Sequence, residues 1–153
     1  MNPRTVPPQR DWILVPLVLG LLVLASACAA NKVLTFDEME NLHAGWHIST
    51  GKRIYADFVQ GHAPLIYWLL APITFPGTAS VFVIARAAQL CLLACAVALI
   101  GFIAEKLQAR AGLLAVTLAL CTTPIIEYGI EIRPDGLLSV LILSAILSAN
   151  SDN

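Results

Sequence analysis

The residues best suited to chemistry are acidic, and most of them fall in two separate stretches of the chain. Seven of the ten Asp and Glu residues lie there: Asp37, Glu38, Glu40, Asp57, Glu127, Glu131 and Asp135. A carboxylate such as that of Asp37 can take the proton of an attacking group. The same stretches carry His62, Arg133, Lys52 and Arg53, which are candidates to contact a phosphate group.

Structural roles compete with these chemical ones. The carboxylate of Asp37 would complement a helix dipole if a helix begins beside it. Arg133 is flanked by Glu131 and Asp135, so a salt bridge to either of them is as reasonable as a contact with phosphate. Both interpretations of each residue stay open at the level of sequence.

A metal site is the weaker interpretation of the histidines. His43 and His47 are spaced i, i+4, and Glu40 lies three residues before His43. Two histidines on a helix without a clear third ligand are usually unliganded. We therefore expect no metal site and no cofactor, with a role for a divalent cation left open.

The composition is that of a membrane protein. Hydrophobic residues make up 58% of the 153 residues and charged residues only 12%, whereas about a quarter of an average soluble domain is charged. The net charge of −1 predicts no nucleic-acid partner. All four cysteines lie in apolar runs without CxxC spacing, so we expect small hydrophobes, not zinc ligands or disulfides.

Four apolar stretches predict an all-α integral membrane protein with three to four transmembrane helices. They cover about residues 12–30, 79–104, 111–126 and 136–149. Pro124 is expected to kink or end the third. The fourth spans only about 21 Å as a helix, less than the ~30 Å hydrocarbon core of a bilayer. We therefore expect a truncated or split protein. Residues 1–153 are interpreted as the N-terminal transmembrane part of a larger protein.

The first stretch has an alternative interpretation as a cleaved signal peptide. Arg4 and Arg10 precede it, and Ala25-Ser26-Ala27 resembles a cleavage site. The length of the apolar run and the stretches that follow it favour a membrane span. In the second stretch Arg86 lies near one end, where snorkelling to the surface is favoured over facing a polar cavity.

The topology places both acidic stretches on one face of the membrane. Lys and Arg residues divide equally between the two sides, so charge alone does not fix the orientation. The loops after the first and third spans nevertheless lie on the same side, whichever side that is. Residues 31–78 and 127–135 are therefore expected to face each other at one bilayer surface.

The loop of residues 31–78 is expected to begin with a helix that lies flat at the membrane interface. Thr35 can cap this helix, and Glu38 can close a capping box. Its apolar stripe would consist of Met39, Leu42 and Trp46. Its opposite face would carry Asn41 and Gly45. The remaining segments, punctuated by Gly and Pro, are expected to be turns between short elements. Their aromatic residues would form an interfacial belt or a sugar-stacking surface: Tyr55, Phe58, Tyr67 and Trp68.

Taken in order, these residues resemble the N-terminal part of GT-C fold membrane glycosyltransferases. The nearest kinds are protein O-mannosyltransferase-like and Rgt-type enzymes and, more distantly, the lipid A aminoarabinose transferase. The resemblance covers nearly the whole chain. It rests on an ordered set of motifs: Asp37-Glu38, Gly51-x-x-Ile54-Tyr55-x-Asp57-Phe58, His62-x-Pro64-Leu65-x-Tyr67 and Glu131-x-Arg133-Pro134-Asp135-Gly136.

The resemblance implies transfer of a sugar from a polyprenyl-phosphate donor in the bilayer to an acceptor glycan, lipid or protein. The reaction would take place at the non-cytoplasmic face of the cell inner (plasma) membrane. It implies catalytic roles for Asp37 and Asp135. The implied substrate-binding residues are Glu38, Tyr55, Asp57, His62 and Arg133. His62 departs from the pattern, because the aminoarabinose enzymes carry Lys at that position.

Other functions are compatible with the same residues. The family's enzymes have many more spans, so the fragment alone is expected to be inactive outside a complete glycosyltransferase. An inactive membrane remnant or a non-catalytic membrane subunit is one alternative. A transporter fragment is another, less favoured because the acids lie in loops and not in the middle of the spans.

Overall fold

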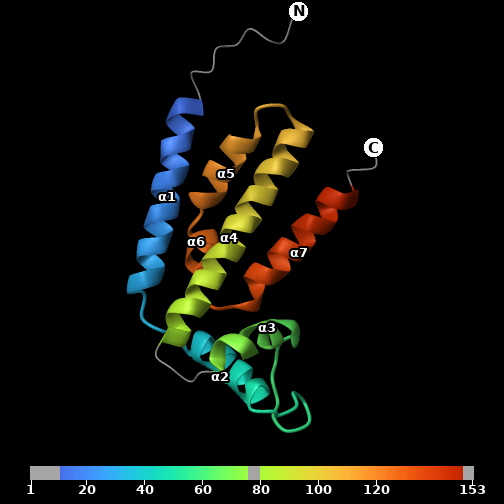
Figure 1. Cartoon of the computed structure of the whole chain (residues 1–153). Coiled ribbons are helices and arrows are strands. Elements are labelled where there is room, and N and C mark those ends of the chain that lie inside the picture. Colours follow the sequence, from blue (N-terminus) through green and yellow to red (C-terminus); the bar gives the residue numbers. More distant parts are fainter. Residues whose placement is uncertain (1–10, 76–79, 150–153) are drawn as a thin grey trace, which may run out of the picture.

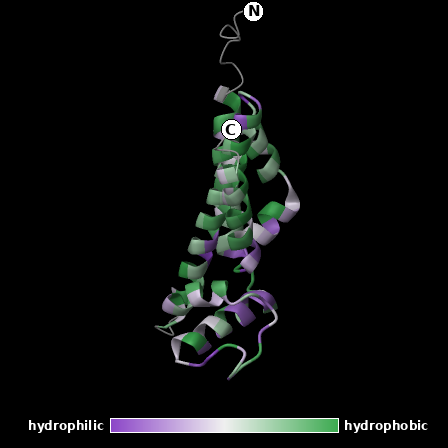
Figure 2. Cartoon of the chain, turned by 90° about the vertical axis from the view of Figure 1, so that its right-hand side faces the viewer, coloured by the Kyte–Doolittle hydropathy of each residue, from purple (hydrophilic) through white to green (hydrophobic). Residues whose placement is uncertain are grey.

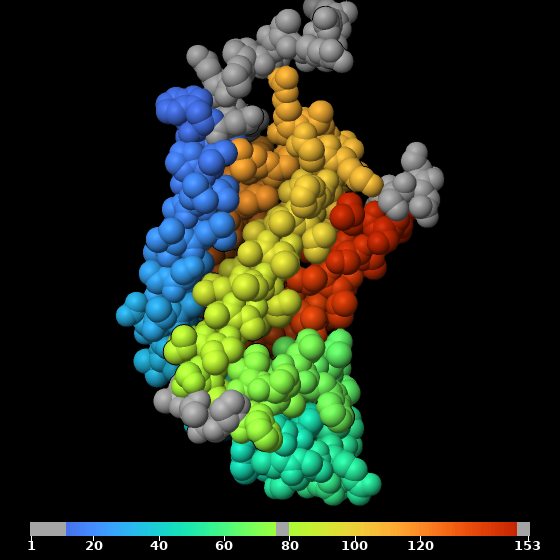
Figure 3. All heavy atoms as spheres, viewed as in Figure 1, coloured from blue at the N-terminus to red at the C-terminus, as the bar shows by residue number. Residues whose placement is uncertain are grey.

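The computed structural model describes residues 11–75 and 80–149, and within these ranges the chain folds into seven helices. Their bounds are α1 Asp11–Asn31, α2 Phe36–Ser49, α3 Leu65–Thr74, α4 Ser80–Leu107, α5 Gly112–Leu120, α6 Thr123–Gly129 and α7 Pro134–Ala149. Helices α1, α4, α5 and α7 run along an elongated bundle, and α2 and α3 lie across one end of it (Figure 1). In the space-filling view α4 runs between α1 and α7 (Figure 3).

Two helices are long and apolar enough to cross a membrane, namely α1 over Trp12–Asn31 and α4. The pair α5 and α6 would make a third span, bent by 72° at the break between them. Helix α7 is apolar but has only 16 residues. Hydrophobic residues follow the bundle, and hydrophilic ones gather toward its α2–α3 end (Figure 2). The structure thus confirms an all-helical protein with two or three candidate membrane spans.

The third predicted span is not one continuous helix. Helix α5 ends at Leu120, Thr122 has extended backbone angles, and Pro124 lies in the first turn of α6. The ring of a proline clashes with the carbonyl group four residues earlier, which here belongs to Leu120. The polar stretch that follows also differs from expectation, because α6 continues to Gly129 and leaves only residues 130–133 outside the helices.

Helix α2 begins as its capping residues predict, but it buries a different face. The Glu38 N–H donates to Thr35 Oγ1 at 3.3 Å, and Glu38 Oε2 accepts from the Thr35 N–H at 3.0 Å. The buried residues are Glu38, Asn41, Leu42, Ala44, Gly45 and Ile48. Met39 and Trp46, two residues of the expected apolar stripe, are exposed. The face that α2 buries against the rest of the chain is the one that carries Asn41 and Gly45, and the interfacial placement of the Met39 stripe stays a prediction.

Helix α3 was not expected, since its segment was interpreted as turns between short elements. It packs on α2 so closely that a Cβ atom on Gly45 would lie 2.9 Å from Leu70 Cβ. Tyr67 is fully buried in this contact and Trp68 is exposed. Tyr67 therefore belongs to the core, not to a surface belt.

Candidate functional site

Arg133 joins the two carboxylates singled out as catalytic. Its Nη1 donates to Asp37 Oδ2 at 2.9 Å, and its Nε donates to Asp135 Oδ2 at 2.9 Å. Asp37 lies in the first turn of α2 and Asp135 in the first turn of α7. Their side chains are 52% and 56% exposed, so each carboxylate is accessible while it holds the guanidinium.

A small cavity lies among these residues. It is lined by Asp37, Glu40, Asn41, His62, Arg133, Pro134 and Asp135. Its volume of about 20 Å³ is enough for roughly one water molecule. His62, which comes from the loop between α2 and α3, thus lies beside the two acids, and its contact with a donor phosphate stays a prediction.

Two further groups surround the Arg133 guanidinium. Glu131 is buried, and its Oε2 lies 3.5 Å from Arg133 Nη1 while its Oε1 lies 2.6 Å from Lys32 Nζ. The Arg133 guanidinium also lies over the Tyr128 ring, 5.1 Å from its centroid. Burial alone would lower the pKa of Arg133, but the hydrogen bond and the charge of Asp135, with Asp37 and Glu131, raise it. Arg133 is therefore a permanent cation between carboxylates.

Glu38 is buried beneath the cluster formed by Asp37, Arg133 and Asp135, and it does not line the cavity. Its side chain is fully buried and accepts from Arg86 Nε at 3.0 Å, Arg86 Nη2 at 2.9 Å and the Ile132 N–H at 3.3 Å. Burial acts to raise the pKa of Glu38, yet the bonds from Arg86, Thr35 and Ile132 together bring that pKa below its ordinary value. A direct contact between Glu38 and a substrate stays a prediction that the observed geometry does not support.

Arg86 binds Glu38, a partner that the sequence did not identify, although a polar surrounding was one of the two alternatives for this arginine. Its side chain is 12% exposed and does not snorkel to the surface. Besides Glu38, it donates through Nη1 to the carbonyl oxygens of Ala29 and Lys32, at 2.8 and 2.6 Å. These carbonyls belong to the end of α1, where backbone acceptors lack helical partners. The sequence feature that could have indicated this partner is the charge of Arg86 inside an apolar helix, because such a charge needs a buried partner.

Asn41 and Glu38 together hold the segment that precedes Arg133. Asn41 Nδ2 donates to the Ile132 carbonyl at 2.8 Å, and Glu38 accepts from the N–H of the same residue. Asn41 is 3% exposed and Ile132 is 1% exposed, so neither bond is shared with bulk water. Two side chains of α2 thereby fix both backbone groups of the residue next to Arg133.

Tyr55 and Asp57 lie outside the cavity, in the loop between α2 and α3. Asp57 Oδ2 accepts from the Arg53 N–H at 2.7 Å, and this bond lowers the pKa of Asp57. Tyr55 Oη donates to the His62 carbonyl at 2.7 Å. Asp57 therefore closes a turn, and Tyr55 anchors the loop that presents His62. Their proposed contacts with substrate stay predictions.

The two histidines of α2 form a ring pair without the surroundings of a metal site. The rings of His43 and His47 have centroids 4.2 Å apart, and His47 also contacts the Phe58 ring at 5.0 Å. In residues 11–75 and 80–149, no three His, Cys, Asp or Glu side chains are grouped as metal ligands would be. The role of a divalent cation stays open.

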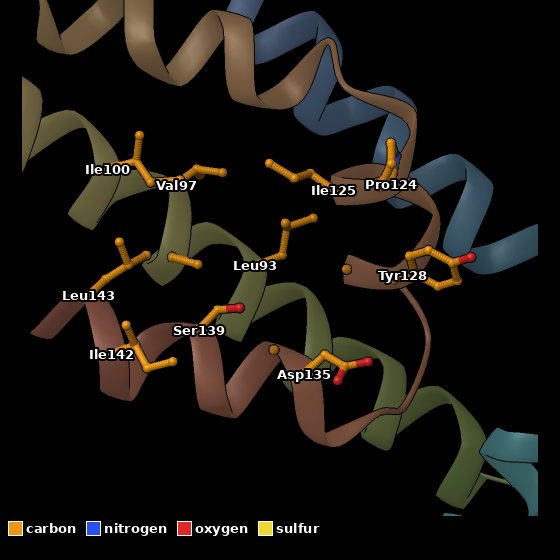
Figure 4. Close-up of a pocket in the computed structure, with 13 residues that line it drawn as sticks. Leu93, Val97, Ile100, Pro124, Ile125, Tyr128, Asp135, Ser139, Ile142 and Leu143 are labelled. Carbon is orange, nitrogen blue, oxygen red and sulfur yellow. The ribbon is translucent and has the colours of Figure 1, made fainter.

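A larger apolar pocket begins at Asp135. It has a volume of about 460 Å³ and lies between α4, α6 and α7. Figure 4 shows Asp135 and Ser139 of α7 on one side of it, Leu93 of α4 beside them, and Tyr128 and Pro124 of α6 across from them. Since Asp135 lines both cavities, the polar cluster and the apolar pocket are adjacent.

Comparisons of the chain with protein-family models, with curated proteins and with solved structures give no match.

Proposed function

We propose that this chain is the N-terminal part of a GT-C type membrane glycosyltransferase. It would transfer a sugar from a polyprenyl-phosphate donor to an acceptor at the non-cytoplasmic face of the plasma membrane. One observation carries the proposal: a single guanidinium, that of Arg133, binds both Asp37 and Asp135 at the edge of an apolar pocket.

The chemistry assigns a separate task to each charge. Asp37 accepts the proton of the acceptor group as that group forms a bond to the anomeric carbon of the sugar. The bond between this carbon and the phosphate oxygen breaks, and the phosphate leaves with the electron pair. Arg133 faces the leaving oxygen and stabilises its developing charge, for which the planar guanidinium is well suited. Asp135 holds Arg133 in orientation.

The apolar pocket supports a lipid-linked donor over a soluble one. Its lining is hydrophobic apart from a few groups near Asp135, which matches an isoprenoid chain that ends in a phosphate. A nucleotide sugar would leave this volume unused and would need polar contacts for its base. The acceptor is left open among a glycan, a lipid and a protein.

The test is a transfer assay on membranes that contain the full-length product of the gene. Radiolabelled polyprenyl-phosphate hexoses and pentoses are supplied, and label is measured in glycan, lipid and protein fractions. Asp37→Asn is expected to abolish transfer without loss of membrane insertion. Glu127→Gln is the matched control, because Glu127 is an exposed acid that does not line the cavity.

The outcomes separate the alternatives. Unchanged transfer by Asp37→Asn contradicts the assignment of the base. A wild-type protein that transfers label from none of the donors contradicts the enzymatic proposal and favours a membrane remnant or a non-catalytic subunit.

A further inference from the structure

Arg86 connects three segments of the chain that are far apart in sequence. Its guanidinium donates to both carboxylate oxygens of Glu38 and to the carbonyl oxygens of Ala29 and Lys32. Its Nη2 also lies 3.5 Å from the Val33 carbonyl. A guanidinium in α4 thereby holds the end of α1, the linker to α2 and the first turn of α2 in one arrangement.

Arg86 is connected to Asp37 and Arg133 through Glu38. Glu38 Oε1 accepts from both Arg86 Nε and the Ile132 N–H. Glu38 is adjacent to Asp37 in α2, and Ile132 is adjacent to Arg133. Each partner of the 2.9 Å contact between Asp37 and Arg133 is therefore covalently next to a residue that the Arg86–Glu38 pair fixes.

We propose that Arg86 is a positioning residue, which sets the placement of Asp37 relative to Arg133 and Asp135 from within the membrane-embedded bundle without touching substrate. The catalytic consequence of this role depends on the function proposed above, but the geometric role does not. Arg86 is absent from the lining of the cavity that holds the two acids, so it acts on them through Glu38 and the end of α1 and not by direct contact.

The arrangement requires arginine and not merely a positive charge. Lysine offers a single ammonium group and cannot fork across both oxygens of a carboxylate while it also donates to separate carbonyls. Arg86→Lys therefore retains the charge that neutralises buried Glu38 but loses the geometry. This substitution separates positioning from charge neutralisation.

The test measures the distance between α2 and α7 without relying on activity. The native cysteines at 28, 91, 95 and 121 are replaced by alanine, and spin labels are attached at Met39→Cys and Leu138→Cys. Both positions are exposed, and neither belongs to the cluster. With Arg86 present, electron–electron spin measurements in proteoliposomes should give one narrow distance distribution.

Arg86→Lys and Arg86→Gln are each expected to broaden that distribution at least twofold. Arg53→Gln is the matched control, since Arg53 is an exposed arginine whose partner Asp57 closes a separate turn; it should leave the distribution unchanged. An unchanged distribution in both Arg86 variants overturns the proposal. Failure of both variants to insert into the membrane also overturns it, because Arg86 would then serve insertion and not site geometry.

Where transfer is measurable, Arg86→Lys should lower kcat at least tenfold and leave KM for the donor within a factor of two. A change confined to KM contradicts positioning. If the wild-type protein transfers no sugar, the distance measurement still decides the role of Arg86, so failure of the proposed function and failure of this inference are distinguishable.

Discussion

Arg133 binds Asp37 and Asp135 through two different nitrogens of one guanidinium, each at 2.9 Å. The two acids come from helices that begin after different candidate membrane spans, so the contact joins the two halves of the candidate site. A third carboxylate, Glu131, lies 3.5 Å from the same guanidinium. An anionic phosphate that approaches Arg133 would compete with Asp37 for it and would leave Asp37 free to accept a proton.

Arg133→Lys should reduce sugar transfer by at least about 100-fold, the scale of losing one preorganised electrostatic contact at a reacting centre. The ammonium group keeps the charge but cannot bind Asp37 and Asp135 with separate nitrogens. The measurement is kcat on membranes that contain equal amounts of protein. Arg110→Lys, in the connection between α4 and α5 at the other end of the bundle, serves as control, and a loss of similar size in that variant would show that the effect is not specific to the site.

Glu38→Gln should lower the free energy of unfolding by about 3–5 kcal/mol, because it leaves Arg86 buried without its counter-charge. The measurement is denaturant unfolding in detergent, followed by helix content. Glu40→Gln is the matched control, since Glu40 is an exposed acid of the same helix. Equal stability of the two variants would contradict a structural role for the buried pair.

The pH dependence of stability follows from the lowered pKa of Glu38. A carboxyl group whose folded-state pKa lies below its unfolded value contributes stability that is fully present above the unfolded value, here 4.5. That contribution is lost as the pH falls through the folded-state pKa. Thermal unfolding between pH 7 and pH 3 should therefore show a decline below about pH 4.5 that is smaller in Glu38→Gln. Parallel curves for the two proteins would contradict the assignment.

Gly45→Ala should destabilise the protein by about 1–3 kcal/mol, the usual cost of overpacking a core. The added Cβ atom would lie 2.9 Å from Leu70 Cβ, and α2 and α3 would have to separate. Gly20→Ala is the control, because a Cβ atom there meets nothing within 4 Å and alanine favours the helix. Thermal unfolding of the two variants should shift in opposite directions, and a stabilised Gly45→Ala would contradict the close packing.

Short-range sequence patterns predicted contacts between residues close in sequence, but they did not predict contacts between different helices. The capping box of Thr35 and Glu38 was predictable because its partners are three residues apart. The partner of Arg86 was not, because Glu38 lies in another element and its side chain already had a local role. The sequence likewise did not indicate which face of α2 contacts α3, because the close approach at Gly45 is visible only once α3 is known to be a helix.

Topology predicted that the two acidic segments approach each other, and the structure shows them in contact, while the membrane side they share stays a prediction. Counting spans places the loops after α1 and after α6 on the same side of the membrane, and in the structure Lys32 Nζ lies 2.6 Å from Glu131 Oε1. Sequence alone did not reveal that Arg133 would bridge the two acids. The two interpretations of Arg133, a phosphate contact or a salt bridge, differ only in which anionic group lies beside its guanidinium.

Cysteine labelling should report the same membrane side for both acidic segments. In a background without the native cysteines, Asp57→Cys and Asp135→Cys are treated in sealed vesicles with a membrane-impermeant maleimide. Both positions should react from one side only, because α2, its following loop and the start of α7 lie at one end of the bundle (Figure 1). A cysteine at Gln108, in the connection between α4 and α5 at the other end, should react from the opposite side. Labelling of positions 57 and 135 from opposite sides would separate Asp37 from Asp135 across the bilayer and would contradict any reaction that uses both.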